Sequence, residues 1–338
     1  MNLNNKTILV TGGTGSFGKS FIDSIIKKHN NIKKLIIFSR DELKQFNLSK
    51  QYNNKKYKFL RFFIGDVRDY KRLDWALKEV DLVIHAAALK QVPAAEYNPI
   101  EAIKTNILGA QNLIEASLNN NVQKVIALST DKASSPINLY GATKLCSDKL
   151  FIAANNFKGG KKISFSVVRY GNIFGSRGSV VHSFLSQKEN DNIIKITDLA
   201  MTRFLLSVEE GVDLVLWSIF NSYGGEIIIP KIPSIKITDL AKIVAPQSKI
   251  KVIGVRPGEK LHEELISIHE SRNCFNFKDK YLILDPLNLK LQKFYKNKGA
   301  IIVKDNFIYE SFSNKQYLSK QQFKKIYKKF SNSLNANI

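Results

Sequence analysis

A tyrosine and a lysine four residues apart, Tyr140 and Lys144, are the side chains in this sequence best placed for redox chemistry. On a helix this spacing puts both on one face, one turn apart. A free tyrosine titrates near ~10, so it is a poor base at neutral pH unless a cation favours the phenolate. Lys144 is placed to supply that cation, and Tyr140 would then take a hydroxyl proton while the carbon loses hydride. Such a pair also arises by chance on surface helices, so the motif alone leaves both interpretations open.

Three further reactive side chains precede the pair: Thr130, Asp131 and Lys132 follow an apolar run at residues 125–128. The run predicts a strand, and in an open parallel sheet the carboxyl ends of strands face the ligand crevice. An extra acid and an extra amine beside a redox tyrosine indicate a reaction with more proton transfers than a simple oxidation.

Composition describes an ordinary folded protein, with 338 residues, 44% hydrophobic residues and 10% aromatics. This length allows one large or two smaller domains. The two cysteines, Cys146 and Cys274, belong to no metal-binding or disulfide pattern, so we expect no metal site and a reducing compartment. Without a signal peptide or an apolar run of ~18 residues, we expect a soluble, cytoplasmic protein with no membrane partner.

A formal charge of +23 raises the question of a nucleic-acid or membrane partner. The lysines are scattered and interleaved with asparagines, and no aromatic-basic motif accompanies them. We therefore expect a solvated basic surface, no nucleic-acid partner, and attraction for phosphorylated substrates.

A glycine-rich turn follows the predicted strand at residues 6–11. Gly13, Gly15 and Gly18 fit G-x-G-x-x-G, and Gly12, Gly15 and Gly18 fit a looser variant. The backbone must turn tightly and approach a pyrophosphate that sits on the N-terminus of the next helix, expected at about residues 16–28. The motif predicts dinucleotide binding.

The second predicted strand, residues 34–38, ends in Ser39 and Arg40, with Lys44 a helical turn further on. An acid at this place usually binds the ribose of NAD, whereas an arginine accommodates the 2′-phosphate of NADP. These residues favour NADP. The alternative is that Asp41 reaches the ribose and Arg40 is a solvated charge.

Strands and helices then alternate. Residues 58–64 end at Asp66-Val67, and residues 81–84 open into His85-Ala86-Ala87-Ala88, where His85 is expected to be a packed histidine. A helix at about residues 99–119 leads to the strand before Thr130, and a further strand is expected at residues 164–170. The rhythm predicts an α/β fold, a Rossmann-type doubly wound parallel sheet with a smaller C-terminal α/β substrate-binding part. We expect a cofactor domain at 1–175, an interleaved substrate part at 176–286, and a lysine-rich tail at 287–338 without a readable role.

Several motifs together resemble the extended short-chain dehydrogenases: T-G-G-T-G-S-F-G, S-R-D-E-L-K-Q, G-D-V-R-D, H-A-A-A-L-K-Q-V-P-A-A-E-Y-N-P, S-T-D-K-A, P-I-N-L-Y-G-A-T-K-L, V-V-R-Y-G-N-I-F-G-S-R-G-S-V and V-R-P-G-E-K-L-H-E. More narrowly they resemble the inverting UDP-N-acetylglucosamine 4,6-dehydratases that begin pseudaminic acid biosynthesis. The match runs from about Lys6 to Glu263. Such enzymes form homo-oligomers, dimers assembling into hexamers.

The resemblance implies a reaction cycle on UDP-N-acetylglucosamine. Tyr140, helped by Thr130 and Lys144, takes the 4-hydroxyl proton while hydride passes from C4 to NADP⁺. Lys132 removes the C5 proton, Asp131 protonates the leaving 6-hydroxyl, and hydride returns to C6. Reprotonation of C5 from the opposite face gives the L-arabino 4-keto-6-deoxy sugar, and the tightly bound cofactor is recycled. Lys132 can be a base only if its pKa falls toward neutrality.

The same resemblance implies the site residues. The cofactor would contact Gly12, Thr14, Gly15, Ser16, Phe17, Gly18, Ser39, Arg40, Lys44, Asp66, Val67, Ala86, Lys90, Tyr140 and Lys144. The nucleotide-sugar would contact Lys90, Asn172, Arg177, Arg203, Arg256 and Glu259. The family usually reads T-D-P-R-M-T-R-F, whereas Leu199 and Ala200 stand here in place of the proline and first arginine, which affects the uridine side.

Three alternatives remain at this point. A 4-epimerase has no use for an acid and base at C5 and C6, so Asp131 and Lys132 speak against it. A dehydratase that also epimerises C3 shares this chemistry and is less firmly separated; retaining dehydratases carry a glutamate where Lys132 stands. A non-catalytic NADP- or RNA-binding Rossmann protein would not need Tyr140 and Lys144.

Overall fold

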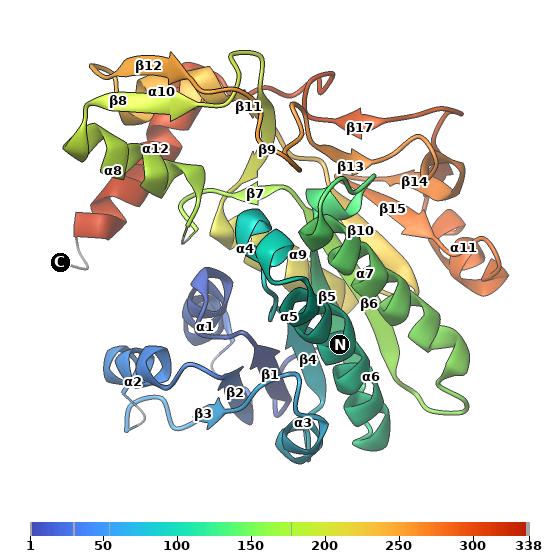
Figure 1. Ribbon diagram of the computed structural model, residues 1–338. Coiled ribbons are helices and arrows are strands. Elements are labelled where there is room, and N and C mark those ends of the chain that lie inside the picture. The colour runs from blue at the N-terminus through green and yellow to red at the C-terminus, as the bar shows by residue number, and fades with distance from the viewer. Residues whose placement is uncertain (1, 30, 54, 177, 336–338) are drawn as a thin grey trace.

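The computed structural model describes the backbone of residues 2–29, 31–53, 55–176 and 178–335 and side chains through residue 331. Its first half alternates strands and helices (Figure 1). The elements are β1 (Thr7–Thr11), α1 (Ser16–Lys28), β2 (Lys34–Ser39), α2 (Glu42–Gln51), β3 (Leu60–Ile64), α3 (Tyr70–Ala76), β4 (Leu82–His85), α4 (Val92–Tyr97), α5 (Pro99–Ile103), α6 (Gly109–Asn119), β5 (Lys124–Thr130), α7 (Leu139–Phe157) and β6 (Ser164–Tyr170).

The second half begins with shorter elements and returns to the main sheet. They are β7 (Asn172–Ile173), α8 (Val180–Asn190), β8 (Ile193–Ile196), β9 (Thr202–Leu206), α9 (Val208–Asn221), β10 (Glu226–Pro230), β11 (Ser234–Lys236), α10 (Ile237–Val244), β12 (Lys249–Val252), β13 (Glu264–Ile266), β14 (Cys274–Phe277), β15 (Lys280–Leu284), α11 (Leu289–Lys296), β16 (Ile301–Ile302), β17 (Tyr309–Glu310) and α12 (Lys320–Asn335).

Within the described residues, the main sheet has ten strands in the order β16-β14-β15-β10-β6-β5-β4-β1-β2-β3. The strands from β3 to β10 pair in parallel, and β15, β14 and β16 extend the sheet in antiparallel pairs. The order β3-β2-β1-β4-β5-β6 is that of a doubly wound nucleotide-binding sheet, so the predicted fold class is confirmed.

Helices cover both faces of this sheet, which explains why its central strands are continuous apolar runs rather than alternating ones. All five residues of β1 are buried. Helices α1 and α9 pack together on one face, and α3, α6 and α7 lie on the other (Figure 1). Helix α1 buries Phe17, Phe21, Ile22 and Ile25, whose spacing forms the apolar stripe of an amphipathic helix. The predicted packed histidine, His85, is 1% exposed and contacts Thr11 through Nδ1 at 2.8 Å.

The single helix expected at residues 99–119 is instead interrupted. A π-helical turn, Lys104–Leu108, separates α5 from α6. The wide turn presents Asn106, which accepts a hydrogen bond from the Leu89 N–H at 2.9 Å and donates to the Leu89 carbonyl at 2.9 Å and to Thr143 Oγ1 at 3.0 Å. The irregularity therefore ties the loop after β4 to α7, and π turns often accompany functional sites.

A second, smaller core lies beside the main sheet. Its members come mainly from α8, β8, α10 and α12, with Phe184, Ile194, Leu240 and Phe323 among the most buried, and β9 and β11 contribute Leu205 and Ile235. The segment after Leu287 supports both parts, because β16 extends the main sheet, β17 pairs with β13, and α12 packs in the second core (Figure 1).

Candidate active site

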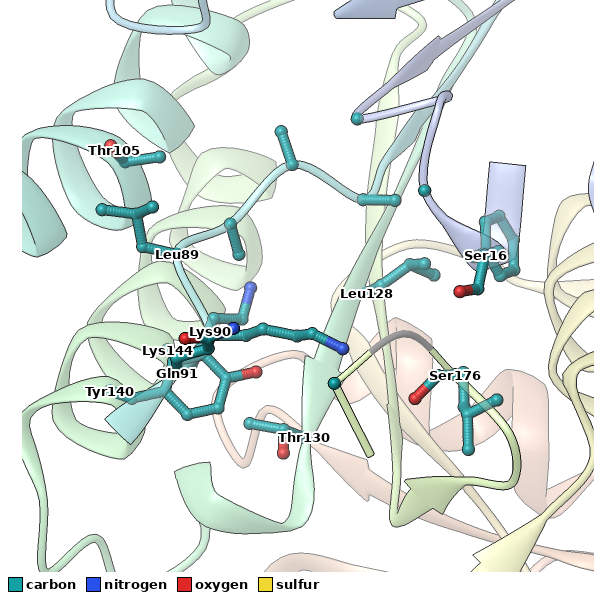
Figure 2. A pocket seen from close by; sticks show the side chains of 18 of the residues that line it. Ser16, Leu89, Lys90, Gln91, Thr105, Leu128, Thr130, Tyr140, Lys144 and Ser176 are labelled. Carbon is teal, nitrogen blue, oxygen red and sulfur yellow. The ribbon is translucent and has the colours of Figure 1, made fainter. Parts of the chain in front are cut away.

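A cleft of about 880 Å³ runs along the carboxyl ends of the parallel strands. It is lined by the turn after β1, the ends of β2 and β3, the loop after β4, the end of β5, the start of α7, and the loop after β6. This is the edge where open α/β sheets bind ligands, and the volume suits an extended one. Figure 2 shows Tyr140 and Lys144 pointing into the cleft, with Ser16 across from them.

The glycine-rich turn has the geometry that a pyrophosphate requires. Gly12 has a φ of +66°, and a Cβ there would lie 2.9 Å from the Ala87 backbone. Gly15 caps α1 without a side-chain hydrogen bond, which leaves the helix N-terminus to an anion. Gly18 does not line the cleft. Because a Cβ on Gly18 would clash with the carbonyl of Gly13, glycine at this position allows α1 to pack closely on the turn.

The end of β2 presents Ser39, Arg40 and Lys44 to the cleft. Ser39 Oγ lies 2.9 Å from Thr14 Oγ1, which joins the end of β2 to the glycine-rich turn. Asp41 does not line the cleft; its carboxylate caps α2 by accepting from the Lys44 N–H at 2.9 Å, and it pairs with Lys44 Nζ at 2.6 Å. The cap gives this carboxylate a structural role at the start of α2.

Asp66 and Val67, at the end of β3, also line the cleft. Burial opposes ionisation of Asp66, but hydrogen bonds from Arg68 outweigh it and lower the Asp66 pKa. Asp66 is therefore an anionic acceptor, the group that an exocyclic amino group of a base would need.

Two residues at the start of α7 determine how closely Tyr140 approaches the segment after β5. Asn138 caps the helix, its side chain accepting from the Gly141 N–H at 2.8 Å. A Cβ on Gly141 would lie 2.2 Å from the carbonyl oxygen of Lys132. Glycine therefore lets the first turn of α7, which carries Tyr140, rest directly on the segment that carries Lys132.

The reactive side chains form one chain of polar contacts. Tyr140 hydrogen-bonds Thr130, and Thr130 Oγ1 donates to Asp131 Oδ1 at 2.9 Å. Lys132 Nζ contacts the same Asp131 oxygen at 3.1 Å and Glu263 Oε1 at 3.0 Å. A hydroxyl, a phenol, an acid and an amine thus meet at one place, as the sequence predicts.

Burial works against ionisation of Tyr140. It raises the pKa of Tyr140 to about 12, although Lys132 and the hydrogen bond with Thr130 act in the opposite direction. Burial also lowers the pKa of Lys144, and Asp148 opposes that effect. The side chains around Tyr140 therefore do not by themselves lower its pKa, contrary to the lowering that the sequence leads one to expect.

The pKa values of Asp131 and Lys132 are both raised, which suits an acid but not a base. Burial raises the pKa of Asp131, which suits a proton donor, and Asp131 Oδ2 has no hydrogen-bond partner among the described residues. For Lys132, burial lowers the pKa, but Asp131 and Glu263 outweigh it and raise it above the ordinary value. This is opposite to the direction expected for a base, because two carboxylates stabilise the ammonium.

The expected nucleotide-sugar residues divide into two groups. Lys90 and Asn172 line the cleft. Arg203, Arg256 and Glu259 do not: Arg203 donates to the carbonyls of residues 202, 260 and 261, and Arg256 is exposed. Glu259 lies 3.6 Å from Arg203 and accepts from Thr197 at 3.2 Å. Arg177 lies outside the described residues.

Sequence reasoning missed Glu263, although it ends the V-R-P-G-E-K-L-H-E motif. It also missed a buried ionic network beneath α7. Arg169, fully buried, pairs with Asp148 at 3.5 Å and Glu270 at 2.8 Å, and Asp148 accepts from Ser129 at 2.7 Å. The neighbours of Arg169 in β6 are apolar. The only signal in the sequence was a charged residue within a strand expected to be buried, which requires a carboxylate partner.

The described ranges contain no group of three His, Cys, Asp or Glu side chains arranged to hold a metal ion. No helix in the described part of the chain has the length and apolar character needed to cross a membrane.

The parallel sheet, the glycine-rich turn and the Tyr140–Lys144 pair define a Rossmann-type enzyme of the extended short-chain dehydrogenase/reductase class. The chain belongs to the polysaccharide biosynthesis protein family, whose model matches residues 8–285.

Two relatives cover most of the chain. An inverting UDP-N-acetylglucosamine 4,6-dehydratase of Campylobacter jejuni (strain 81-176) is 52% identical over 94% of this chain and 96% of its own. A UDP-glucose 4-epimerase of Rickettsia conorii is 44% identical over 86% of both. The resemblance to the inverting dehydratases is thereby confirmed.

Solved structures agree. Pen from Bacillus thuringiensis is 36% identical and superposes with a TM-score of 0.87 over 97% of this chain and all of its own. The dTDP-glucose 4,6-dehydratase of Streptomyces venezuelae, solved with NAD, has a TM-score of 0.67 over 75% of this chain and 86% of its own. At 21% identity it supports the fold alone.

Proposed function

We propose that this protein is an inverting UDP-N-acetylglucosamine 4,6-dehydratase, which converts its substrate to the 4-keto-6-deoxy L-arabino sugar nucleotide and water. The observation that carries this proposal is the contact chain from Tyr140 through Thr130 and Asp131 to Lys132 in a cleft built for a dinucleotide. The 52% identity to an inverting dehydratase supports it.

Three members of the contact chain have a proton to move. Tyr140 takes the proton of the 4-hydroxyl, with Thr130 holding the phenol oxygen and Lys144 supplying positive charge. Asp131, whose pKa burial raises, gives its proton to the leaving 6-hydroxyl. Lys132 removes the C5 proton. General acid–base catalysis of this kind contributes about 10²–10⁴-fold in rate per group.

The residues around the glycine-rich turn fit a nicotinamide dinucleotide, which when bound would accept hydride from C4 and return it at C6. Its pyrophosphate would lie on Gly12, Gly15 and the N-terminus of α1. Thr14, Ser16, Phe17, Ala86 and Lys90 line the same cleft.

We propose NADP as this cofactor. Ser39, Arg40 and Lys44 line the cleft near the end of β2, where the ribose 2′-position would lie, and a guanidinium and an ammonium there would match a phosphate. Asp41, the alternative ribose ligand, is engaged as a helix cap and pairs with Lys44.

For the substrate, we propose contacts from Lys90 and Asn172, which line the cleft. Arg177, Arg203, Arg256 and Glu259 are proposed for the uridine diphosphate side. Arg203 would have to leave its backbone carbonyls to reach a phosphate, so its contribution through the peptide segment at 260–261 is the simpler expectation.

We further propose that the product enters pseudaminic acid biosynthesis, for flagellin or surface glycosylation, and that the enzyme is a homo-oligomer, a dimer assembling to a hexamer. Both follow from the resemblance to inverting dehydratases.

The Rickettsia relative makes 4-epimerisation the specific rival. Mass spectrometry of the purified enzyme with UDP-N-acetylglucosamine separates the two reactions, because dehydration removes one water whereas an epimer has the mass of the substrate. A product lacking one water supports the proposal. An isobaric product, seen as a new sugar nucleotide on chromatography, would assign the epimerase instead.

A further inference from the structure

Lys132 lies between two carboxylates that come from distant parts of the chain. Asp131 precedes it after β5, and Glu263 precedes β13. Their exposed side-chain fractions are 1% and 3%, and each places one oxygen about as close to Nζ, at 3.1 Å and 3.0 Å. An amine held in this way has one fixed position and a stabilised charge.

The surrounding groups distribute the protons unevenly. Asp131 Oδ1 accepts from both Thr130 and Lys132, so its remaining oxygen, Oδ2, is where a proton would sit. Burial also opposes ionisation of Glu263, but Lys132 and Arg203 outweigh it and lower the Glu263 pKa. Arg203 Nε lies 3.6 Å from Glu263 Oε1, Lys260 adds positive charge, and the phenol of Tyr140 faces Lys132. The raised pKa of Asp131 and the lowered pKa of Glu263 make Glu263 the more acidic of the two carboxyl groups beside Lys132.

We propose that Glu263 is the positioning residue of Lys132: its carboxylate holds Nζ at a fixed place in the cleft, from which Lys132 acts on C5 of the sugar. The inference rests on the proposed function. The 3.0 Å contact from Nζ to Oε1 is the anchor, and without it the amine would be free to leave its place beside the substrate.

Asp131 is the poorer anchor for the amine. In the proposed reaction Asp131 must carry a proton for the departing hydroxyl, so it cannot also be the constant negative charge that holds Lys132. Glu263 has no such duty, and its Oε2 has no hydrogen-bond partner among the described residues.

The C-terminal segment fixes Glu263 in place. The Glu263 N–H donates to Ser311 Oγ at 3.0 Å, and the Ser311 N–H donates to the Glu263 carbonyl at 2.8 Å. Ser311 directly follows β17, which pairs with β13. The segment around Ser311, which carries no recognisable motif, thus supports Lys132 through Glu263.

The test measures the titration of Lys132 directly, without turnover. Purified protein with its co-purified cofactor is labelled with trace acetic anhydride across pH, and the Lys132 peptide is quantified by mass spectrometry against exposed Lys50. In Glu263→Gln the half-labelling pH of Lys132 should fall by about one unit or more. In Glu264→Gln, the matched change at the neighbouring glutamate that accepts from Ser135, it should not move. An unchanged Lys132 titration in Glu263→Gln overturns the proposal.

A second variant and a kinetic measurement complete the test. If Glu263→Gln does not fold, as judged by circular dichroism, Glu263→Asp replaces it, and its longer contact should lower the half-labelling pH in the same direction. With substrate, Glu263→Gln should slow C5 deuterium exchange about 100-fold with little change in KM. If the wild type does not dehydrate UDP-N-acetylglucosamine, the proposed function fails, while the labelling still decides the coupling of Lys132 to Glu263.

Discussion

Asp131 Oδ1 lies 3.1 Å from the Nζ of Lys132, although the two residues are adjacent in the chain and adjacent side chains usually diverge. A single turn of 3₁₀ helix, Asp131–Ala133, directs both into the cleft, and Thr130 caps it by accepting from the Lys132 N–H. The pair places an acid and an amine beside Tyr140. A dehydratase needs this combination and an epimerase does not.

Replacing Lys132 with glutamine tests the assignment of the C5 base. The variant should fold and retain its cofactor, because a neutral amide adds no third carboxylate beside Asp131 and Glu263, but it should lose inversion at C5. Product stereochemistry from proton couplings is the measurement. Retention of the L-arabino product would remove Lys132 from this role.

Gly141→Ala tests the contact between α7 and the Lys132 segment. The added Cβ would meet the Lys132 carbonyl, so Tyr140 and Lys132 must move apart, and a shift of about 1 Å can lower kcat about 100-fold. Steady-state kinetics and cofactor content are the measurements.

The matched control for that substitution is Gly160→Ala, where a Cβ meets nothing within 4 Å. It should leave activity unchanged. Equal losses in both variants would mean that the effect is not specific to the site.

Arg40→Ala tests the cofactor proposal. Arg40 is half exposed, so solvent weakens its pairing with a phosphate, and we expect the ratio of NADP to NAD in the purified protein to fall about tenfold. Lys50→Ala, at the far end of α2, is the control and should change nothing. A wild-type protein that carries NAD would contradict the proposal before any substitution is made.

Glu270→Gln tests the buried network and predicts a pH dependence. Burial opposes ionisation of Glu270, but Arg169 and hydrogen bonds from Ser267 and Ser134 lower its pKa. A lowered pKa stabilises the folded state above the ordinary glutamate value, and this stability is lost as pH falls through the folded value.

The substitution should therefore lower the free energy of unfolding by roughly 3 kcal/mol at neutral pH and flatten its decline in acid. Denaturant titrations over the acid range measure both effects. Glu115→Gln, at an exposed helix position bonded to Gln111, should leave the curve unchanged. An undiminished acid decline in Glu270→Gln would assign it to other carboxylates.

Local patterns account for what the sequence predicts well. The turn at Gly12 and Gly15 and the i,i+4 pair of Tyr140 and Lys144 depend on neighbouring residues, and strand periodicity gives the sheet. The contacts of Glu263 with Lys132 and of Arg169 with Glu270 join distant segments, and no spacing encodes them. Arg203 illustrates the same limit, since its place in a motif does not reveal that its guanidinium binds backbone carbonyls.

Proton NMR of the purified enzyme with UDP-N-acetylglucosamine in D₂O, with only the co-purified cofactor, tests the central claim most directly. We predict a new 6-methyl signal, deuterium at C5, and couplings of an L-arabino sugar. A methyl signal with D-xylo couplings would assign a retaining dehydratase and contradict the role of Lys132. Appearance of the 4-epimer alone would contradict the acid–base roles of both Asp131 and Lys132.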